Sequence, residues 1–198
     1  VKYLTVYALS LDNKKRPTDE VNTLYELLEL FAASEREELV GQRVKVEVVG
    51  DLESLPRSCQ EAIAGLCEAT AGGDAMRFRL AVAYGAREDV VRAVREVARR
   101  VALGQLPPEA IDASTLRSAM WTAGAPDIDL LIRTGGEHRL SDFMLLEASY
   151  AELYFSDVAW PDFTAAHLLT ALHDFGRRER RFGLTSSQVQ ADKGLPAR

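Results

Sequence analysis

Residues 76–84 read Met-Arg-Phe-Arg-Leu-Ala-Val-Ala-Tyr, and this stretch decides the fold. Its apolar residues predict a strand, and the turn Gly72-Gly73-Asp74 stands before it. A helix from about Arg87 to Leu103 follows, with valines at helical spacing, and Pro107-Pro108 ends it. A strand followed directly by an amphipathic helix is the repeating unit of an α/β protein.

The same alternation continues in both directions along the chain. Further strands are predicted over residues 1–9, 44–50, 128–133 and 150–155. Helices are predicted after Thr18, around Ile63 to Cys67, near 114–120 and over 164–180, with Thr18 as the N-cap of the first. Helix-length crossovers between strands imply a central, mostly parallel sheet with helices on both faces. Sites in such sheets gather at the carboxyl ends of the strands.

Length and composition are those of an ordinary globular protein. With 198 residues, 47% hydrophobic and 27% charged, the chain suits one well-cored domain over residues 1–198. The net charge of -6 argues against a general affinity for nucleic acid or anionic membranes. Cys59 and Cys67 are expected to be small buried hydrophobes. Without a signal peptide or a long apolar run, a cytoplasmic setting is expected.

The first strand begins at Val1 with almost nothing before it. Because a buried strand seldom opens a chain, we expect the true beginning of the protein to lie upstream. The domain is then N-terminally incomplete, with a strand and a helix missing from the sequence shown.

The segment with the most chemistry is Asp129 to Ser141, DLLIRTGGEHRLS. The strand ends in Arg133, two glycines allow the backbone to turn closely, and Arg139 and Ser141 follow. Forked guanidinium donors match phosphate oxygens, so these three side chains are a candidate diphosphate cradle. The alternative is a surface loop with ordinary ion pairs.

Two further groups of polar residues follow strands. Glu152 is a lone carboxylate in the apolar run Tyr150 to Phe155 and is a candidate Mg²⁺ ligand, or else it pairs with an arginine. After the first strand, Ser10 and Asn13 are candidates to hydrogen-bond a phosphate or assist a proton transfer, and Arg16 adds charge. The alternative there is a polar loop that caps the next helix.

These motifs together resemble one enzyme family. Two motifs between Asp129 and Phe163, IRTGGEHRLS and YAELYF…WPDF, resemble the signature region of cis-prenyltransferases, the family of undecaprenyl diphosphate synthase. Residues 7–17, YALSLDNKKRP, look like that family's YAFSTENWKRP motif, and the segments 48–51, 83–87 and 177–183 match in order. The similarity covers nearly the whole chain.

The resemblance implies an enzyme that lengthens an allylic diphosphate, such as farnesyl or geranyl diphosphate, with isopentenyl diphosphate. Arg16, Arg133, Arg139 and Ser141 would bind substrate, Ser10 and Asn13 would act where the reacting ends meet, and Glu152 would bind Mg²⁺. A homodimer, a medium- or long-chain polyprenyl product and peripheral membrane contact through that lipid are also implied. Nucleic acid is not an expected partner.

The chain departs from the family pattern in three places. The family's aspartate-glycine-asparagine motif, which carries the catalytic aspartate, is absent and is expected upstream of Val1. Lys14 stands where the family has tryptophan, and Ala83 and Ala86 replace an asparagine and a glycine of the NYGGR turn. Two alternatives therefore stay open: a catalytically silent partner subunit of a two-component prenyltransferase, and a synthase that joins its units head-to-middle. No Walker or Rossmann fingerprint supports a nucleotide-binding protein.

Overall fold

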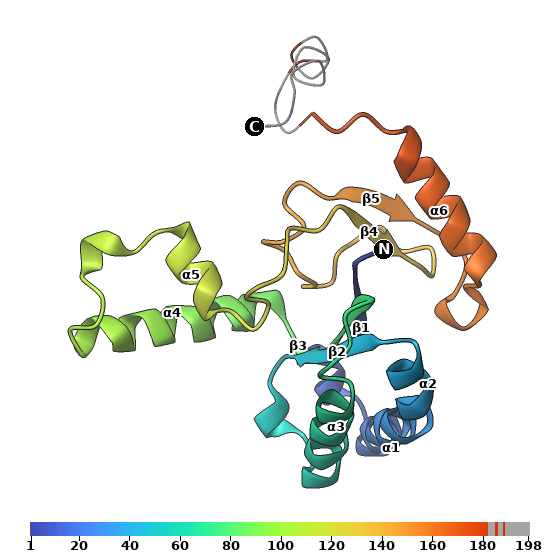
Figure 1. Ribbon diagram of the computed structural model, residues 1–198, viewed down its shortest axis with the longest axis horizontal. Helices are drawn as coiled ribbons and strands as arrows, with labels where there is room; N and C mark the ends of the chain where they lie inside the picture. The colour runs from blue at the N-terminus through green and yellow to red at the C-terminus, as the bar shows by residue number, and fades with distance from the viewer. Residues whose placement is uncertain (182–184, 186–187, 189–198) are drawn as a thin grey trace. The chain divides into compact units, whose positions relative to one another are not determined.

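The computed structural model describes residues 1–181, 185 and 188. The described chain forms two compact units, one of residues 1–125 with 142–144 and the other of 126–141 with the described residues from 145 onward. Figure 1 labels the helices and strands of both units. A single domain over 1–198 stays a prediction.

The first unit holds a parallel sheet of three strands in the order β1-β3-β2. Its elements, which Figure 1 colours from blue to yellow-green, are β1 (Tyr3–Ser10), α1 (Thr18–Ser34), α2 (Arg36–Gly41), β2 (Val44–Val49), α3 (Arg57–Ala69), β3 (Met76–Tyr84), α4 (Ala86–Ala102) and α5 (Ala113–Ala119). The central strand β3 is buried over its last six residues. This continuous burial is the reason for the apolar run that marks the strand in the sequence.

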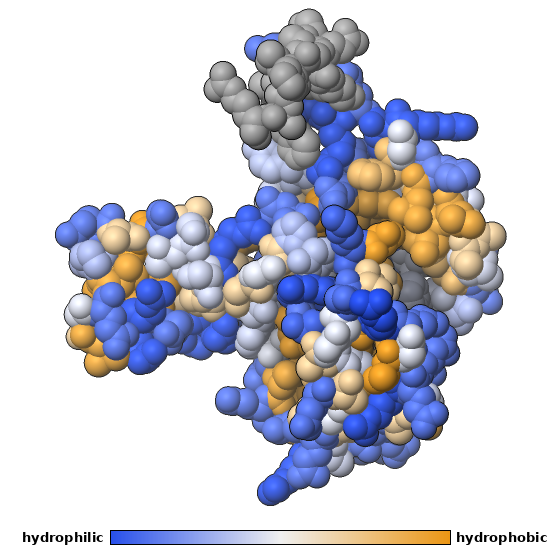
Figure 2. Space-filling view, in the orientation of Figure 1, coloured by the Kyte–Doolittle hydropathy of each residue, from blue (hydrophilic) through white to orange (hydrophobic). Residues whose placement is uncertain are grey.

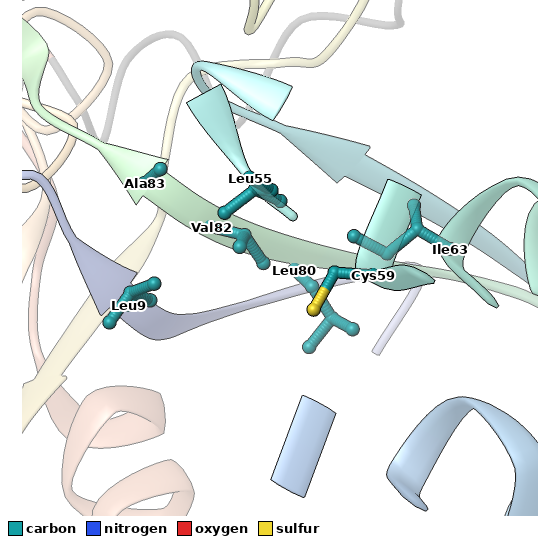
Figure 3. Packing of buried hydrophobic residues seen from close by; sticks show 7 residues of the cluster. All are labelled: Leu9, Leu55, Cys59, Ile63, Leu80, Val82 and Ala83. Carbon is teal, nitrogen blue, oxygen red and sulfur yellow. The ribbon is translucent and has the colours of Figure 1, made fainter. Parts of the chain in front are cut away.

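One face of this sheet carries the hydrophobic core. Leu80 and Val82 of β3 point to the same side and pack with Leu9 of β1 and with Cys59 and Ile63 of α3, as Figure 3 shows. Half-buried residues of α1 complete the cluster, and α1, α2 and α3 lie together on this side of the sheet in Figure 1. The alternation of side chains along β3 therefore sends Phe78, Leu80 and Val82 into the core.

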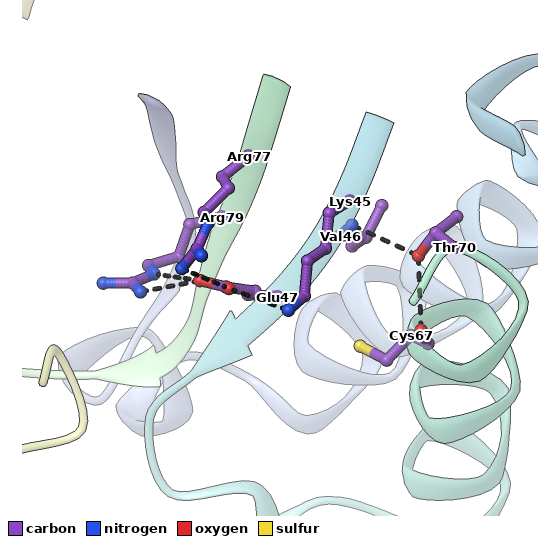
Figure 4. Close-up of polar contacts among 7 residues, drawn as sticks. All are labelled: Lys45, Val46, Glu47, Cys67, Thr70, Arg77 and Arg79. Atoms are coloured by element: carbon purple, nitrogen blue, oxygen red, sulfur yellow. Dashed lines mark hydrogen bonds and ion pairs between the residues drawn. The ribbon is translucent and has the colours of Figure 1, made fainter. Parts of the chain in front are cut away.

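The opposite face of the same strands carries charge. Arg79, whose side chain is only 7% exposed, bonds Glu47 of β2 at 2.7 Å through Nη2 and the Thr122 carbonyl at 3.2 Å through Nη1. Arg77 and Lys45 lie at 3.4 and 3.9 Å from the same carboxylate (Figure 4). Because Arg79 is almost wholly buried, its pairing with Glu47 and the carbonyl is what makes that burial tolerable.

The second unit holds a parallel pair of strands, β4 (Leu130–Arg133) and β5 (Glu152–Phe155), followed by α6 (Ala165–Arg177). The described strands thus form two parallel sheets, where the sequence pattern favours one central sheet. The alternation of elements shows that strands exist and run parallel, but it does not say which edges pair. The α/β class with helix-flanked parallel sheets is confirmed.

Most elements form where the sequence predicts them, but several of their bounds differ by two or three residues. Thr18 is not an N-cap: it is the first helical residue of α1, and Pro17 takes the cap position with its carbonyl accepting from the Val21 N–H at 3.1 Å. The short helix α2 was not expected, and β4 and β5 each begin two residues later than predicted.

Both cysteines are free, with Cys59 buried and Cys67 half-buried, which confirms their role as small hydrophobes. Burial, with a hydrogen bond to Glu29 at 3.0 Å, raises the pKa of the Cys59 thiol to about 12. The thiol therefore stays protonated and unreactive at neutral pH.

Gly50 ends β2 with a positive φ of 130°, and a Cβ built there would lie 1.9 Å from the Val82 carbonyl oxygen. We expect Gly50→Ala to lower the free energy of unfolding by roughly 3 kcal/mol, since it adds both strain and a backbone clash in the core. Gly65→Ala is the matched control, because that glycine lies inside α3 and a Cβ added there would meet no neighbour within 4 Å. The control should stabilise by about 0.5–1 kcal/mol in urea denaturation. Equal stability of the two variants would contradict the prediction.

Candidate active site

The loop after β1 brings Ser10 and Asn13 together. Asn13 Oδ1 accepts from the Ser10 N–H at 2.9 Å, and Ser10 Oγ accepts from the Asn13 N–H at 3.0 Å. This reciprocal pair holds the 3-10 turn Asp12–Lys15 in place. It does not cap the next helix, because α1 has Pro17 at its N-cap and no side-chain cap hydrogen bond. In this pair, both side chains act only as hydrogen-bond acceptors. The Ser10 hydroxyl proton and the Asn13 Nδ2 protons have no hydrogen-bond acceptor among the described residues.

Lys14 lies within this turn, and Arg16 follows it directly. Arg16 is exposed and its Nη1 lies 3.9 Å from Glu20 of α1, an ion pair that contributes little to stability. Lys14, which replaces the family tryptophan, contacts Ser54 Oγ through Nζ. The lysine therefore makes a polar contact where the resemblance implies an aromatic one.

A cleft of about 290 Å³ opens in the first unit at the carboxyl ends of β1 and β3. Tyr7 forms part of its wall, stacked on Phe143 with ring centroids 4.5 Å apart and donating its hydroxyl to the Tyr84 carbonyl at 2.9 Å. Charged groups of both signs line the rest, among them Lys15, Arg87 and Asp142. Asp142 also anchors the start of α4, because its carbonyl accepts from the Ala86 N–H at 2.8 Å.

In the second unit, the glycine turn after β4 is held by backbone hydrogen bonds. The Gly135 N–H donates to the Val158 carbonyl at 2.8 Å, and the Gly136 N–H donates to the Ser156 carbonyl at 2.9 Å. Both glycines have a positive φ, of 83° and 71°. The glycines therefore supply the left-handed turn that the sequence predicts, while their N–H groups are already occupied.

Arg133 and Arg139 converge on one carboxylate. Arg133 Nη2 donates to Glu137 Oε2 at 2.9 Å, and Arg139 Nη2 contacts the same oxygen. Arg133 Nε is buried and has no hydrogen-bond partner among the described residues. Partial desolvation acts to raise the pKa of Glu137, but hydrogen bonds from Arg139 and Arg133 outweigh it and hold the pKa below its usual value. The cluster thus has two guanidiniums, one ionised carboxylate and, at Arg133 Nε, a buried donor without a partner among the described residues.

Ser141 closes the predicted cradle with an exposed side chain and a left-handed φ of 50°. Asp142 and Met144, next along the chain, also have positive φ, of 61° and 44°. Backbone strain of this kind concentrates at functional sites. Neither Ser141 nor Glu152 hydrogen-bonds to Arg133 or Arg139 in the described part of the chain.

Glu152 is paired with an arginine, which is the alternative to a Mg²⁺ ligand that the sequence analysis left open. Its Oε2 accepts from Arg178 Nη1 at 2.9 Å, and Arg178 also bonds the Leu153 carbonyl at 3.0 Å and Asp174 at 2.6 Å. Hydrogen bonds that Arg178 donates to Glu152 first, and then to Asp174, raise the pKa of its guanidinium. Arg178 therefore ties the end of α6 to β5.

No group of three or more His, Cys, Asp or Glu side chains within the described residues is placed to hold a metal ion. A Mg²⁺ ion that uses substrate phosphates needs only one or two carboxylates. Glu152 fits that need, because Arg178 occupies Oε2 only and Oε1 has no hydrogen-bond partner among the described residues. Glu152 Oε1 could therefore serve as one protein ligand of a Mg²⁺ ion whose other ligands include diphosphate oxygens.

Hydrophobic side chains gather on the surface of the second unit, over β5 and beside α6 in Figure 2. The exposed large hydrophobics of this unit are Leu146, Tyr150, Leu153, Trp160 and Leu169. Within α6, Leu169 is 56% exposed, while Leu168, Leu172 and Phe175 are half-buried. No helix in the described part of the chain is long and apolar enough to cross a membrane.

Three residues that pair with charged groups of the candidate site had no assigned role in the sequence analysis: Glu137, Asp142 and Arg178. Glu137 had a signal, since it stands four residues after Arg133 and two before Arg139. Asp142 had none, because its partner Arg87 is distant in sequence. Arg178 lies in the segment 177–183 that matches the family, but its partner Glu152 is 26 residues away. Parallel sheets with arginines clustered at a strand's carboxyl end define an α/β protein suited to binding phosphate groups.

Comparisons with known proteins identify the family. A family model described as putative undecaprenyl diphosphate synthase matches residues 1–183. An isoprenyl transferase of Geobacillus kaustophilus is 43% identical over 95% of this chain and 73% of its own length. A (2E,6E)-farnesyl-diphosphate-specific ditrans,polycis-undecaprenyl-diphosphate synthase of Pseudomonas aeruginosa is 42% identical over 97% of this chain and 76% of its own.

A solved structure agrees with the sequence matches. Lavandulyl diphosphate synthase from Lavandula x intermedia, in complex with dimethylallyl diphosphate, superposes with a TM-score of 0.90 at 41% identity, over 92% of this chain and 79% of that one. The chain belongs to the cis-prenyltransferase family of undecaprenyl diphosphate synthase and is a prenyl-transferring enzyme.

Proposed function

We propose that this enzyme condenses isopentenyl diphosphate with an allylic diphosphate, such as farnesyl or geranyl diphosphate, to make a medium- or long-chain polyprenyl diphosphate. The observation that carries the proposal is the convergence of Arg133 and Arg139 on a single anionic group at the end of β4. The farnesyl specificity in the name of the Pseudomonas aeruginosa relative supports farnesyl diphosphate as a primer.

Arg133 and Arg139 bind the isopentenyl diphosphate through forked donors, and the exposed Ser141 hydroxyl adds a hydrogen bond. The allylic C–O bond breaks with its electron pair on the departing diphosphate. The double bond of isopentenyl diphosphate then forms the new C–C bond, and loss of a proton restores a double bond. Positive charge is needed where the diphosphate leaves, and Arg16 is available to supply it.

Ser10 and Asn13 act at the reacting ends. Because their oxygens already accept hydrogen bonds from each other's backbone, the Ser10 hydroxyl and the Asn13 amide are oriented as donors. Such fixed donors suit phosphate oxygens or the hydrogen-bonded path of the departing proton.

Glu152 would hold Mg²⁺ together with diphosphate oxygens, and the hydrogen bond from Arg178 orients that carboxylate. The ion, when bound, neutralises charge that develops on the diphosphate.

We also propose a homodimer formed through the exposed hydrophobic surface of the second unit, where Trp160 is 62% and Leu169 56% exposed. A second copy of the chain would remove this apolar surface from water. A cytoplasmic setting, peripheral membrane contact through the lipid product and the absence of a nucleic-acid partner stay predictions.

The full-length protein, incubated with Mg²⁺, labelled isopentenyl diphosphate and farnesyl or geranyl diphosphate, should give elongated polyprenyl products. Chromatography of the dephosphorylated products measures chain length, and their structure separates head-to-tail from head-to-middle joining. Failure to incorporate label with either primer would contradict the enzyme and favour a silent partner subunit.

Replacing Arg133 by alanine should raise the KM for isopentenyl diphosphate by about tenfold or more, the effect of losing a charge-assisted hydrogen bond. Arg133→Lys should give a smaller rise, because a point charge replaces a fork. Arg57→Ala is the control, since Arg57 is exposed on α3 and, among the residues that the structure describes, pairs only with Glu61. An unchanged KM in Arg133→Ala would remove this residue from the cradle.

Leu169→Glu should convert the proposed dimer into monomers, because it places a charge in the buried centre of the interface. Sedimentation equilibrium measures the mass. Leu30→Glu serves as the control, since Leu30 is similarly exposed on α1 of the first unit, at 63%. A wild-type protein that is monomeric, or a variant that stays dimeric, would show that this surface is not the interface.

A further inference from the structure

Glu137 occupies the donors that the substrate needs. Its Oε2 contacts both Arg133 and Arg139, and Arg133 Nη2 lies 2.9 Å away. These guanidiniums are the groups to which the proposed function assigns a diphosphate. A carboxylate and a phosphate oxygen compete for the same forked donors, because guanidinium binds both with similar geometry.

The carboxylate is not needed to shape the turn. Gly135 and Gly136 are already fixed by their hydrogen bonds to Val158 and Ser156. The Glu137 side chain is 39% exposed and that of Arg139 is 64% exposed, so the ion pairs are open to water and weak. A weak, solvent-accessible contact can be exchanged readily for a stronger one.

Charge decides which ligands win that exchange. Glu137 brings a single negative charge to two guanidiniums, and Arg133 Nε remains without an acceptor among the described residues. An incoming monoanion would replace the single negative charge of Glu137 with another single negative charge, so the exchange would add little binding free energy. A diphosphate brings more than one negative charge and several acceptor oxygens, so it can satisfy both arginines.

We propose that Glu137 is an internal stand-in anion, which holds Arg133 and Arg139 in the free enzyme and is displaced by the diphosphate of the substrate. The inference rests on the proposed function, since it takes the diphosphate as the ligand of this cluster. Glu137 is a specificity-determining residue: it excludes singly charged anions and sets the affinity for diphosphate below what the two arginines alone would give.

The test is calorimetric titration of the full-length protein with inorganic pyrophosphate and, separately, with acetate, in metal-free buffer. Glu137→Gln keeps the size of the side chain but removes its charge. We expect the variant to bind pyrophosphate about tenfold more tightly than wild type and to bind acetate measurably, because the competing ion is gone. Glu61→Gln, which removes the carboxylate of an exposed Arg57 pair on α3, should change neither affinity.

Steady-state kinetics supply the second readout. Glu137→Gln should lower the KM for isopentenyl diphosphate while kcat stays equal or falls, and Glu137→Ala should behave in the same direction. Pyrophosphate affinity that is unchanged or weaker in both variants would overturn the inference.

Arg133→Ala separates this failure from failure of the proposed cradle. If Arg133→Ala abolishes pyrophosphate binding but Glu137→Gln does not tighten it, the cradle stands and the stand-in role is wrong. If Arg133→Ala leaves pyrophosphate binding intact, the cradle and the inference are both wrong.

Discussion

The pairing of β3 with β1 on one edge and β2 on the other is the constraint on which the first unit depends. Because β3 is buried on both faces, its side chains must alternate between a hydrophobic core and a paired charge cluster. The same pairing brings the carboxyl ends of the strands to one edge of the sheet. The Ser10 loop and the cleft beside Tyr7 and Tyr84 lie there for that reason.

Arginine–carboxylate pairs recur wherever the chain holds a functional side chain. Arg178 fixes Glu152, and Glu137 sits between Arg133 and Arg139. A cluster of like charges would repel itself in the absence of substrate, so each cation here has an anionic neighbour. These pairs hold the guanidiniums of Arg133, Arg139 and Arg178 against carboxylates in the structure described here.

Much of this arrangement was predictable. The apolar run of β3, the helical valine spacing of α4 and the glycine turn after β4 are local patterns, and their elements formed where expected. Arg133, Arg139, Ser10 and Asn13 were recognisable because their motifs are contiguous. Thr18 as an N-cap was wrong, since Pro17 takes that position. The pairing of Glu152 with Arg178, across 26 residues, has no local signature.

The sequence by itself determined the α/β class, the strand and helix order, the family and the residue types of the cradle, since these follow from periodicity and short motifs. Only the tertiary structure decided that the described strands pair as two sheets, that Glu137 occupies both arginines and that Ser10 and Asn13 keep their donors free. Strand pairing and hydrogen-bond occupancy depend on which groups meet in space. A linear pattern does not contain that information.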